Sequence, residues 1–188
     1  MSGCQYVGAG ADLKDHLSRC SFDEQNKKIP CQDITCNEEV AMGEMVQHLK
    51  GVHGSLENVA DSSGKMMRVA RFARSDNVNY AYWAPQTCSY NNQTFFLHAD
   101  NWDKVWTFWV AVLGNEGEAR KYEVEMSIPK KEGCNFYMGF KGKVFSSDED
   151  VGNVVRDRDN VLRLENNLAE VNPDGSFEFK LDYRIICL

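Results

Sequence analysis

Two cysteines and two histidines stand close together in the first third of the sequence, at Cys31, Cys36, His48 and His53. Thiolate sulfur and imidazole nitrogen are the donors that structural zinc sites use, and such sites fill all four tetrahedral positions with protein. Four residues separate the cysteines, eleven separate the two pairs, and four separate the histidines. A disulfide framework needs no histidine nearby, whereas a zinc site mixes both residue types. The pattern therefore predicts one structural zinc site with no open position for catalysis.

The local sequence also predicts the elements that position these donors. Residues 32–35, between the cysteines, form a short turn that presents two sulfur atoms to one ion. Residues 40–53 predict a helix, because apolar residues recur at three- and four-residue spacing. The apolar positions of this helix are Met42, Met45, Val46, Leu49 and Val52. We expect the helix to bring both imidazoles to the cysteine turn.

A second and weaker set of donors, Cys4, His16 and Cys20, lies upstream. Residues 12–19 predict a short helix, which places His16 and Cys20 one turn apart on one face. A structural site needs four ligands, and only three are present. The fourth ligand lies upstream of residue 1, or a carboxylate such as Asp12 or a water replaces it. The sequence thus indicates a second zinc site that is one ligand short. The remaining cysteines, Cys88, Cys134 and Cys187, are expected to be buried free thiols.

Composition limits the classes of function. The 188 residues are 43% hydrophobic and carry a formal net charge of −7, so a packed core is expected and disorder is not. No apolar run approaches the roughly 20 residues of a membrane span, and the first residues do not resemble a secretory signal, so an intracellular protein is expected. Residues 1–55 contain five Lys and Arg against eight Asp and Glu. This acidic balance argues against nucleic-acid binding, which requires basic residues to neutralise phosphates.

From about residue 55 the periodicity changes from helical to strand-like. The strands expected are residues 66–73, 78–84, 93–99, 105–113, 120–128, 135–141, 161–164 and 176–186. Turn signals such as Asn172-Pro-Asp-Gly175 separate them. Many short strands at this spacing predict a mainly β antiparallel sandwich over residues 55–188, after small zinc modules in residues 1–54.

Two local features allow more than one interpretation. The first is a basic series, Lys65, Arg68, Arg71 and Arg74, which would form a stripe on a helix or a solvated rim on an edge strand. The second is an aromatic cluster, Tyr80, Tyr82, Trp83 and Tyr90, which would line a peptide groove or belong to the core and rim of the sandwich.

Several of these segments resemble the seven in absentia (SINA/SIAH) family of ubiquitin ligases. The resemblance is carried by DLKDHLSRC at 12–20, the Cys31–His53 spacing, QTC at 86–88, FFL at 95–97, VAVLG at 110–114, EARKY at 118–122 and IIC at 185–187. That family combines a RING domain, which recruits the E2 enzyme, with two zinc fingers and a substrate-binding sandwich related to TRAF and MATH domains. The resemblance covers nearly the whole chain.

The resemblance implies the substrate-recognition and dimerisation region of such a ligase, in the cytoplasm and also in the nucleus. It would form a homodimer and bind extended peptide motifs of target proteins by strand addition, for ubiquitin-dependent degradation. It implies a peptide groove that involves Asn58, Val59, Ala60, Asp61, Ser62, Tyr80, Tyr82 and Trp83. Neither a membrane nor a nucleic acid is an expected partner.

The sequence also departs from the family. No third cluster of cysteines exists to build a RING, so the chain alone is not expected to transfer ubiquitin, and an E2 partner requires a RING upstream. The family's Asp-Trp pair in the groove is replaced by Ala81-Tyr82, with Trp83 following, which puts the usual peptide specificity in doubt. The alternatives are a TRAF-type signalling adaptor, which would form a trimer, and a RING-less scaffold without ligase activity.

Overall fold

The structure is a computed structural model that describes residues 6, 8, 10, 12–13, 26–61, 64–72, 80–82, 84–102, 104–128, 138–150, 154, 159–165, 170–171 and 177–188. For residues 58–59, 65–72, 80–82, 170–171 and 177–180 it describes the backbone alone. The chain divides into two compact units, Met1–Gly54 and Ser55–Leu188. In the described residues, no helix is long and apolar enough to cross a membrane.

The first unit contains a short hairpin followed by a helix. Strand β1 (Lys28–Pro30) pairs antiparallel with β2 (Glu39–Ala41), and Ile29 faces Val40 across the pair. A 3-10 turn, η2 (Met42–Glu44), leads into helix α2 (Met45–His53). Met45 and Leu49, four residues apart, are fully buried and form the apolar face of α2. The helix ends at Gly54, whose φ of 65° is the left-handed conformation that favours glycine at a helix end.

Two details of the predicted helix at 40–53 are wrong. Residues 40 and 41 belong to a strand, because Val40 is buried in the pairing with Ile29. Val52 is 64% exposed and does not belong to the apolar face. The buried face of α2 is narrower than the sequence periodicity suggested, since Met45 and Leu49 are its buried residues.

The second unit contains two sheets. In the described residues, the larger sheet has seven strands, β3 (Glu57–Val59), β5 (Tyr80–Tyr82), β6 (Gln86–Tyr90), β7 (Gln93–Trp102), β8 (Val105–Val112), β11 (Phe145–Ser146) and β12 (Leu162–Glu165). Their order is β11-β8-β7-β6-β3, with β12 also beside β8 and β5 also beside β7. The pairings β3–β6 and β11–β8 are parallel, and the other printed pairings of this sheet are antiparallel.

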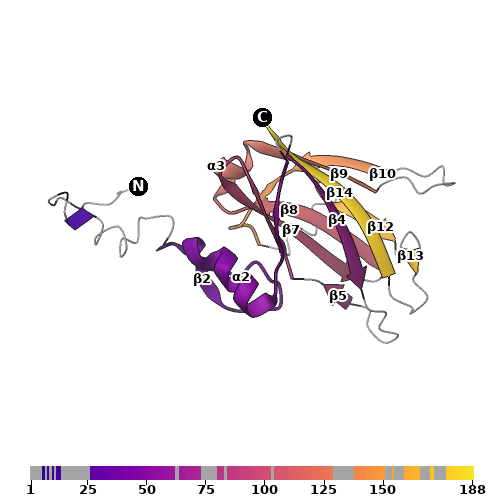
Figure 1. The fold of residues 1–188 in the computed structure, drawn as a ribbon, viewed down its shortest axis with the longest axis horizontal. Coiled ribbons are helices and arrows are strands. Elements are labelled where there is room, and N and C mark those ends of the chain that lie inside the picture. Colours follow the sequence, from indigo (N-terminus) through magenta and orange to yellow (C-terminus); the bar gives the residue numbers. More distant parts are fainter. Residues whose placement is uncertain are drawn as a thin grey trace. The chain divides into compact units, whose positions relative to one another are not determined.

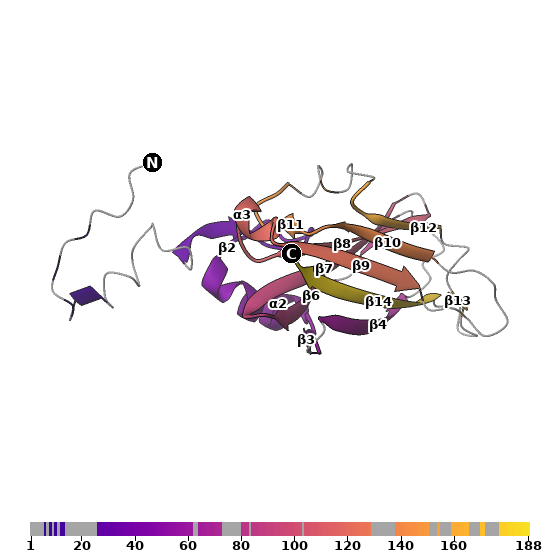
Figure 2. The ribbon, with the colours of Figure 1, turned by 90° about the horizontal axis from the view of Figure 1, so that it is seen from above.

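The smaller sheet is antiparallel in all of its described pairings. It contains β4 (Lys65–Phe72), β9 (Tyr122–Ile128), β10 (Met138–Lys143), β13 (Glu170–Val171) and β14 (Phe177–Cys187). The long strand β14 pairs with both β4 and β9 (Figure 1, Figure 2). A short helix, α3 (Glu116–Ala119), connects β8 of the larger sheet to β9 of the smaller one, and the Asn115 side chain accepts the Glu118 N–H at its start.

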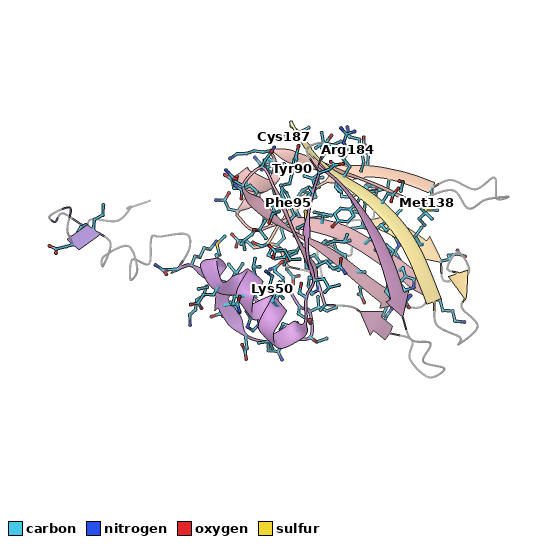
Figure 3. All side chains as sticks on the ribbon, in the orientation of Figure 1. Lys50, Tyr90, Phe95, Met138, Arg184 and Cys187 are labelled. Atoms are coloured by element: carbon cyan, nitrogen blue, oxygen red, sulfur yellow. The ribbon has the colours of Figure 1, made fainter. Side chains whose placement is uncertain are left out.

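One hydrophobic core joins the two sheets. Phe95, Leu97, Phe108 and Val110 contribute to it from the larger sheet. The smaller sheet contributes Tyr122, Val124, Met126, Leu181, Tyr183 and Ile185. Figure 3 shows the side chains between the layers, Phe95 among them. Because alternate residues of a strand point to opposite faces, these positions place the two sheets face to face. The prediction of a mainly β fold built on antiparallel sheets is confirmed, and each expected strand overlaps an observed one.

The cysteines of the second unit differ from the expectation. Cys88 is buried in the core, as predicted, and burial raises the pKa of its thiol to about 12. Cys187, near the end of β14, is exposed, so its predicted burial is wrong. Cys187 is the last residue of β14 and lies beyond Ile185, which belongs to the core. Cys134 lies outside the described residues.

Replacing Phe108 by alanine tests the shared core. Phe108 is fully buried, so we expect Phe108→Ala to lower the free energy of unfolding by about 3–5 kcal/mol, as measured by chemical denaturation. Leu188→Ala is the matched control, because Leu188 is 71% exposed and its loss should change the free energy by less than about 0.5 kcal/mol. Equal effects of the two substitutions would contradict the placement of Phe108.

Thiol labelling tests the different environments of Cys88 and Cys187. At pH 8 the buried Cys88 remains protonated, because its raised pKa lies well above the pH, and the thiolate is the reactive form. We expect an alkylating reagent to modify Cys187 in the native protein and Cys88 only after unfolding, as read by peptide mass spectrometry. Rapid native labelling of Cys88 would be inconsistent with this structure.

Candidate metal centre

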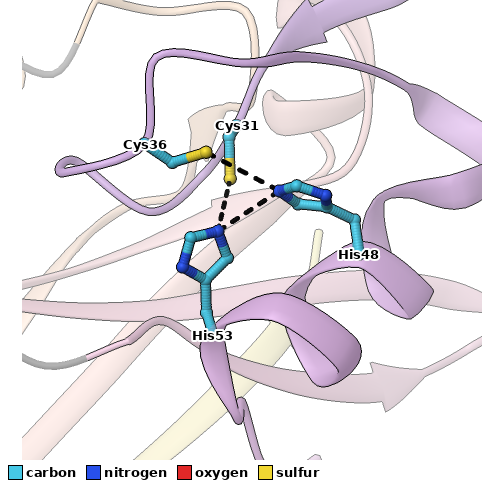
Figure 4. A group of neighbouring side chains, drawn as sticks. All are labelled: Cys31, Cys36, His48 and His53. Atoms are coloured by element: carbon cyan, nitrogen blue, oxygen red, sulfur yellow. Dashed lines mark hydrogen bonds between the residues drawn. The ribbon is translucent and has the colours of Figure 1, made fainter.

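Four side chains of the first unit gather around one point (Figure 4). They are Cys31, Cys36, His48 and His53, and their donor atoms all lie within 4.8 Å of one another. Cys31 directly follows β1, Cys36 lies in the loop before β2, and both histidines lie on α2. The arrangement that the sequence spacing predicted is therefore present, and these four residues could hold one metal ion.

Backbone hydrogen bonds of the loop between β1 and β2 hold the two sulfur atoms. The Cys31 N–H donates to the Glu38 carbonyl at 2.8 Å, which closes the loop where the two strands separate. Within the loop, the Cys36 N–H donates to the Asp33 carbonyl at 2.9 Å and forms a tight turn. The Asp33 N–H lies 3.4 Å from Cys31 Sγ and donates to it. The loop thus positions Cys31 Sγ through a hydrogen bond to the sulfur atom itself. It positions Cys36 Sγ through the backbone turn that holds Cys36.

Three distances between the donor atoms match those expected around tetrahedral zinc. Zn–S bonds of about 2.3 Å and Zn–N bonds of about 2.0–2.1 Å give S···N separations of about 3.6 Å and N···N separations of about 3.3 Å. In the structure, Cys31 Sγ lies 3.6 Å from His53 Nε2, and Cys36 Sγ lies 3.7 Å from His48 Nε2. The two Nε2 atoms are 3.2 Å apart. Both the donor types and the spacing therefore fit a zinc ion.

Burial makes the site unfavourable for a bare thiolate. Cys31 is 7% exposed, and burial, together with a smaller contribution from the neighbouring Cys36, raises the pKa of its thiol to about 12. A divalent cation would supply the positive charge that two neighbouring thiolates require, one buried and one half-buried, and its binding would release protons. The residues present thus fit a structural metal by their electrostatics as well as by their geometry.

Each histidine directs its second ring nitrogen towards a carboxylate. His53 Nδ1 lies 3.3 Å from Asp33 Oδ2, and His48 Nδ1 lies 3.7 Å from Glu38 Oε2. The sequence interpretation did not include these two acids. The signal available was their position, since both lie within two residues of a cysteine of the set.

The other predicted site residues are placed only in part. Cys4, His16 and Cys20, the weaker donor set, lie outside the described residues, as do Ser62 and Trp83 of the predicted groove. Asn58 and Val59 belong to β3, Ala60 and Asp61 follow it, and Tyr80 and Tyr82 belong to β5.

Both groove segments lie on the same side of β7 in the larger sheet. Strand β5 pairs with residues 100–102 of β7, and β6 pairs with residues 93–97 of the same strand. Strand β3 lies outside β6, with Asn58 opposite Cys88. In the described part of the chain, no strand pairs with the outer side of β3 or of β5.

Comparison with protein-family models and with curated proteins found no match for this chain.

Removing one donor tests the metal centre. Cys36→Ala leaves three ligands, and we expect the zinc content of the purified protein, measured by mass spectrometry of the metal, to fall by one equivalent. Cys187→Ala is the control, because Cys187 is an exposed cysteine of the second unit. An unchanged zinc content in Cys36→Ala would rule out this cluster as the binding site.

Proposed function

We propose that this chain is the substrate-recognition and dimerisation region of a seven in absentia type ubiquitin ligase. In this proposal, Cys31, Cys36, His48 and His53 hold a structural zinc ion. The two-sheet unit is of the TRAF/MATH type and binds extended peptide motifs of proteins destined for ubiquitin-dependent degradation. The chain itself binds and does not catalyse, so ubiquitin transfer depends on a RING and its E2 enzyme.

The observation that carries the proposal is the outer side of β3 in the larger sheet. An edge strand presents backbone N–H and C=O groups to which an extended peptide can add as a further strand. This edge belongs to a unit of two face-to-face sheets that follows a Cys₂His₂ cluster in the chain. The sequence resemblance implies the same order, a zinc module followed by a sandwich.

Hydrogen bonds along β3 identify which residues turn outward. The Leu56 carbonyl accepts from the Thr87 N–H at 3.1 Å, and the Ala60 N–H donates to the Ser89 carbonyl at 3.3 Å. Even-numbered residues of this segment therefore direct their backbone groups towards β6. Because successive residues of a strand alternate, Glu57 and Val59 direct theirs to the opposite side. Val59 would form main-chain hydrogen bonds to a bound peptide.

A glycine holds the edge segment against the rest of its unit. Gly64 follows β3, and its N–H donates to the Asp61 carbonyl at 2.9 Å. Its own carbonyl accepts from the Ile185 N–H at 3.0 Å, on a strand of the smaller sheet. With φ at 75° and a Cβ position that would clash with the Ile185 carbonyl, this position accepts only glycine without strain. The edge is thus tied to the core at a fixed point, as a preformed binding site requires.

Substituting Val59 tests strand addition directly. Peptides are first selected from a random library displayed on phage, with the wild-type chain as the target. Val59→Pro removes the outward N–H and leaves the bonds to β6, so we expect the dissociation constant of a selected peptide to rise about tenfold. Val59→Ala is the matched control, because it shortens the same side chain and keeps the N–H. Equal affinities of the two variants would exclude β3 as the docking edge.

Light scattering of the purified chain tests the assembly. The proposal expects a dimer. A trimer would instead favour a TRAF-type signalling adaptor, and formation of ubiquitin chains by this chain alone would contradict its non-catalytic role.

A further inference from the structure

We propose that Asp33 is the positioning residue of the metal centre. Its carboxylate would hold the His53 ring so that Nδ1 carries the proton and Nε2 presents its lone pair to the metal. This inference rests on the zinc-binding role proposed above for the four-residue cluster.

The two nitrogens of the His53 ring face different partners. Nε2 lies 3.6 Å from Cys31 Sγ and 3.2 Å from His48 Nε2, among the other donors. Nδ1 lies 3.3 Å from Asp33 Oδ2. An imidazole that binds a metal through one nitrogen usually donates the N–H of the other to a carboxylate or carbonyl, which fixes the tautomer and orients the ring. Asp33 is placed to accept that hydrogen bond.

The carboxylate of Asp33 is itself held in place. Its Oδ1 accepts from the Thr35 N–H at 2.9 Å and from Thr35 Oγ1 at 2.6 Å, so Oδ2 is left to face His53. The Asp33 N–H donates to Cys31 Sγ, and the Asp33 carbonyl accepts from the Cys36 N–H. One residue of the loop therefore contacts three members of the donor set, Cys31, Cys36 and His53.

The two acids near the site, Asp33 and Glu38, differ in burial. The Asp33 side chain is 2% exposed, and a carboxylate buried to this degree requires a strong partner such as the polarised N–H of a metal-bound imidazole. The Glu38 side chain is 70% exposed and lies 3.7 Å from His48 Nδ1. Water screens such a contact, and a mobile surface side chain orients a ring poorly. The effect of a buried carboxylate on His53 can therefore be compared with that of an exposed carboxylate on His48 in the same protein.

The test compares Asp33→Asn with Glu38→Gln in the full chain. Asparagine retains an oxygen for the two Thr35 donors but turns an amide towards the His53 N–H, where two donors would face each other. We expect the zinc dissociation constant, measured by competition with a chromophoric chelator, to rise about 10- to 100-fold in Asp33→Asn. We expect a change below about threefold in Glu38→Gln. Thr35→Val removes the hydroxyl bond to Oδ1 but keeps the carboxylate, so it should stay close to wild type if the contact with His53 is what matters.

A measurement on the wild-type chain keeps the proposal testable even if Asp33→Asn fails to fold. The ¹⁵N chemical shifts of the His53 ring in the zinc-bound protein report which nitrogen binds the metal and which carries the proton. The proposal requires metal on Nε2 and a proton on Nδ1, and the reverse assignment would overturn it. Equal zinc affinities of Asp33→Asn and Glu38→Gln would overturn it too. If zinc content is the same in wild type and in Cys36→Ala, the metal site itself fails, which is a separate result.

Discussion

The described part of the first unit buries few apolar side chains, and this limits the stability that its core can provide. In residues 26–54, the buried apolar side chains are Ile29, Cys31, Val40, Met42, Met45 and Leu49. Modules of this size cannot offset the conformational entropy of folding with so small a core, and they usually need a metal or a disulfide. The four donors that converge from a hairpin loop and a helix would supply such a cross-link with a metal ion bound. The hairpin, the turn at Asp33 and the end of α2 can be understood as the parts that bring these donors together.

The sequence predicted the donor set because spacing and residue type carry that information locally. Strands β9 and β14 were also predictable, since their alternation of apolar and polar residues reflects one buried face. Strand β8 was predictable for another reason, because its residues form a nearly continuous apolar run that is buried along most of its length. The short strands β3, β6 and β11 were not expected, because two to five residues contain too little periodicity. The strand at Val40 was mistaken for a helix, because it lies directly before the helical apolar series that starts at Met42 and its cross-strand contact with Ile29 is not visible in the sequence.

The contact between Asp33 and His53 shows a different limit of prediction from the sequence. The two residues are 20 positions apart, and their approach depends on where α2 ends and how the loop turns. Neither residue alone signals the pair, since an Asp in a turn is common for reasons of local backbone hydrogen bonding. Outer contacts of a metal site are therefore harder to read from a sequence than the ligands, although both depend on the same geometry.

The shortness of β3 has a consequence for any strand that adds to it. Only alternate residues of a three-residue strand direct backbone groups outward, so a single edge offers few main-chain hydrogen bonds, each with a net contribution of about 0.5–1.5 kcal/mol. Selective recognition must then come mainly from side-chain pockets beside the edge. A monovalent complex of this kind would be weak and short-lived. An assembly with two such edges would gain its strength from effective concentration, and would favour partners that present the same motif twice.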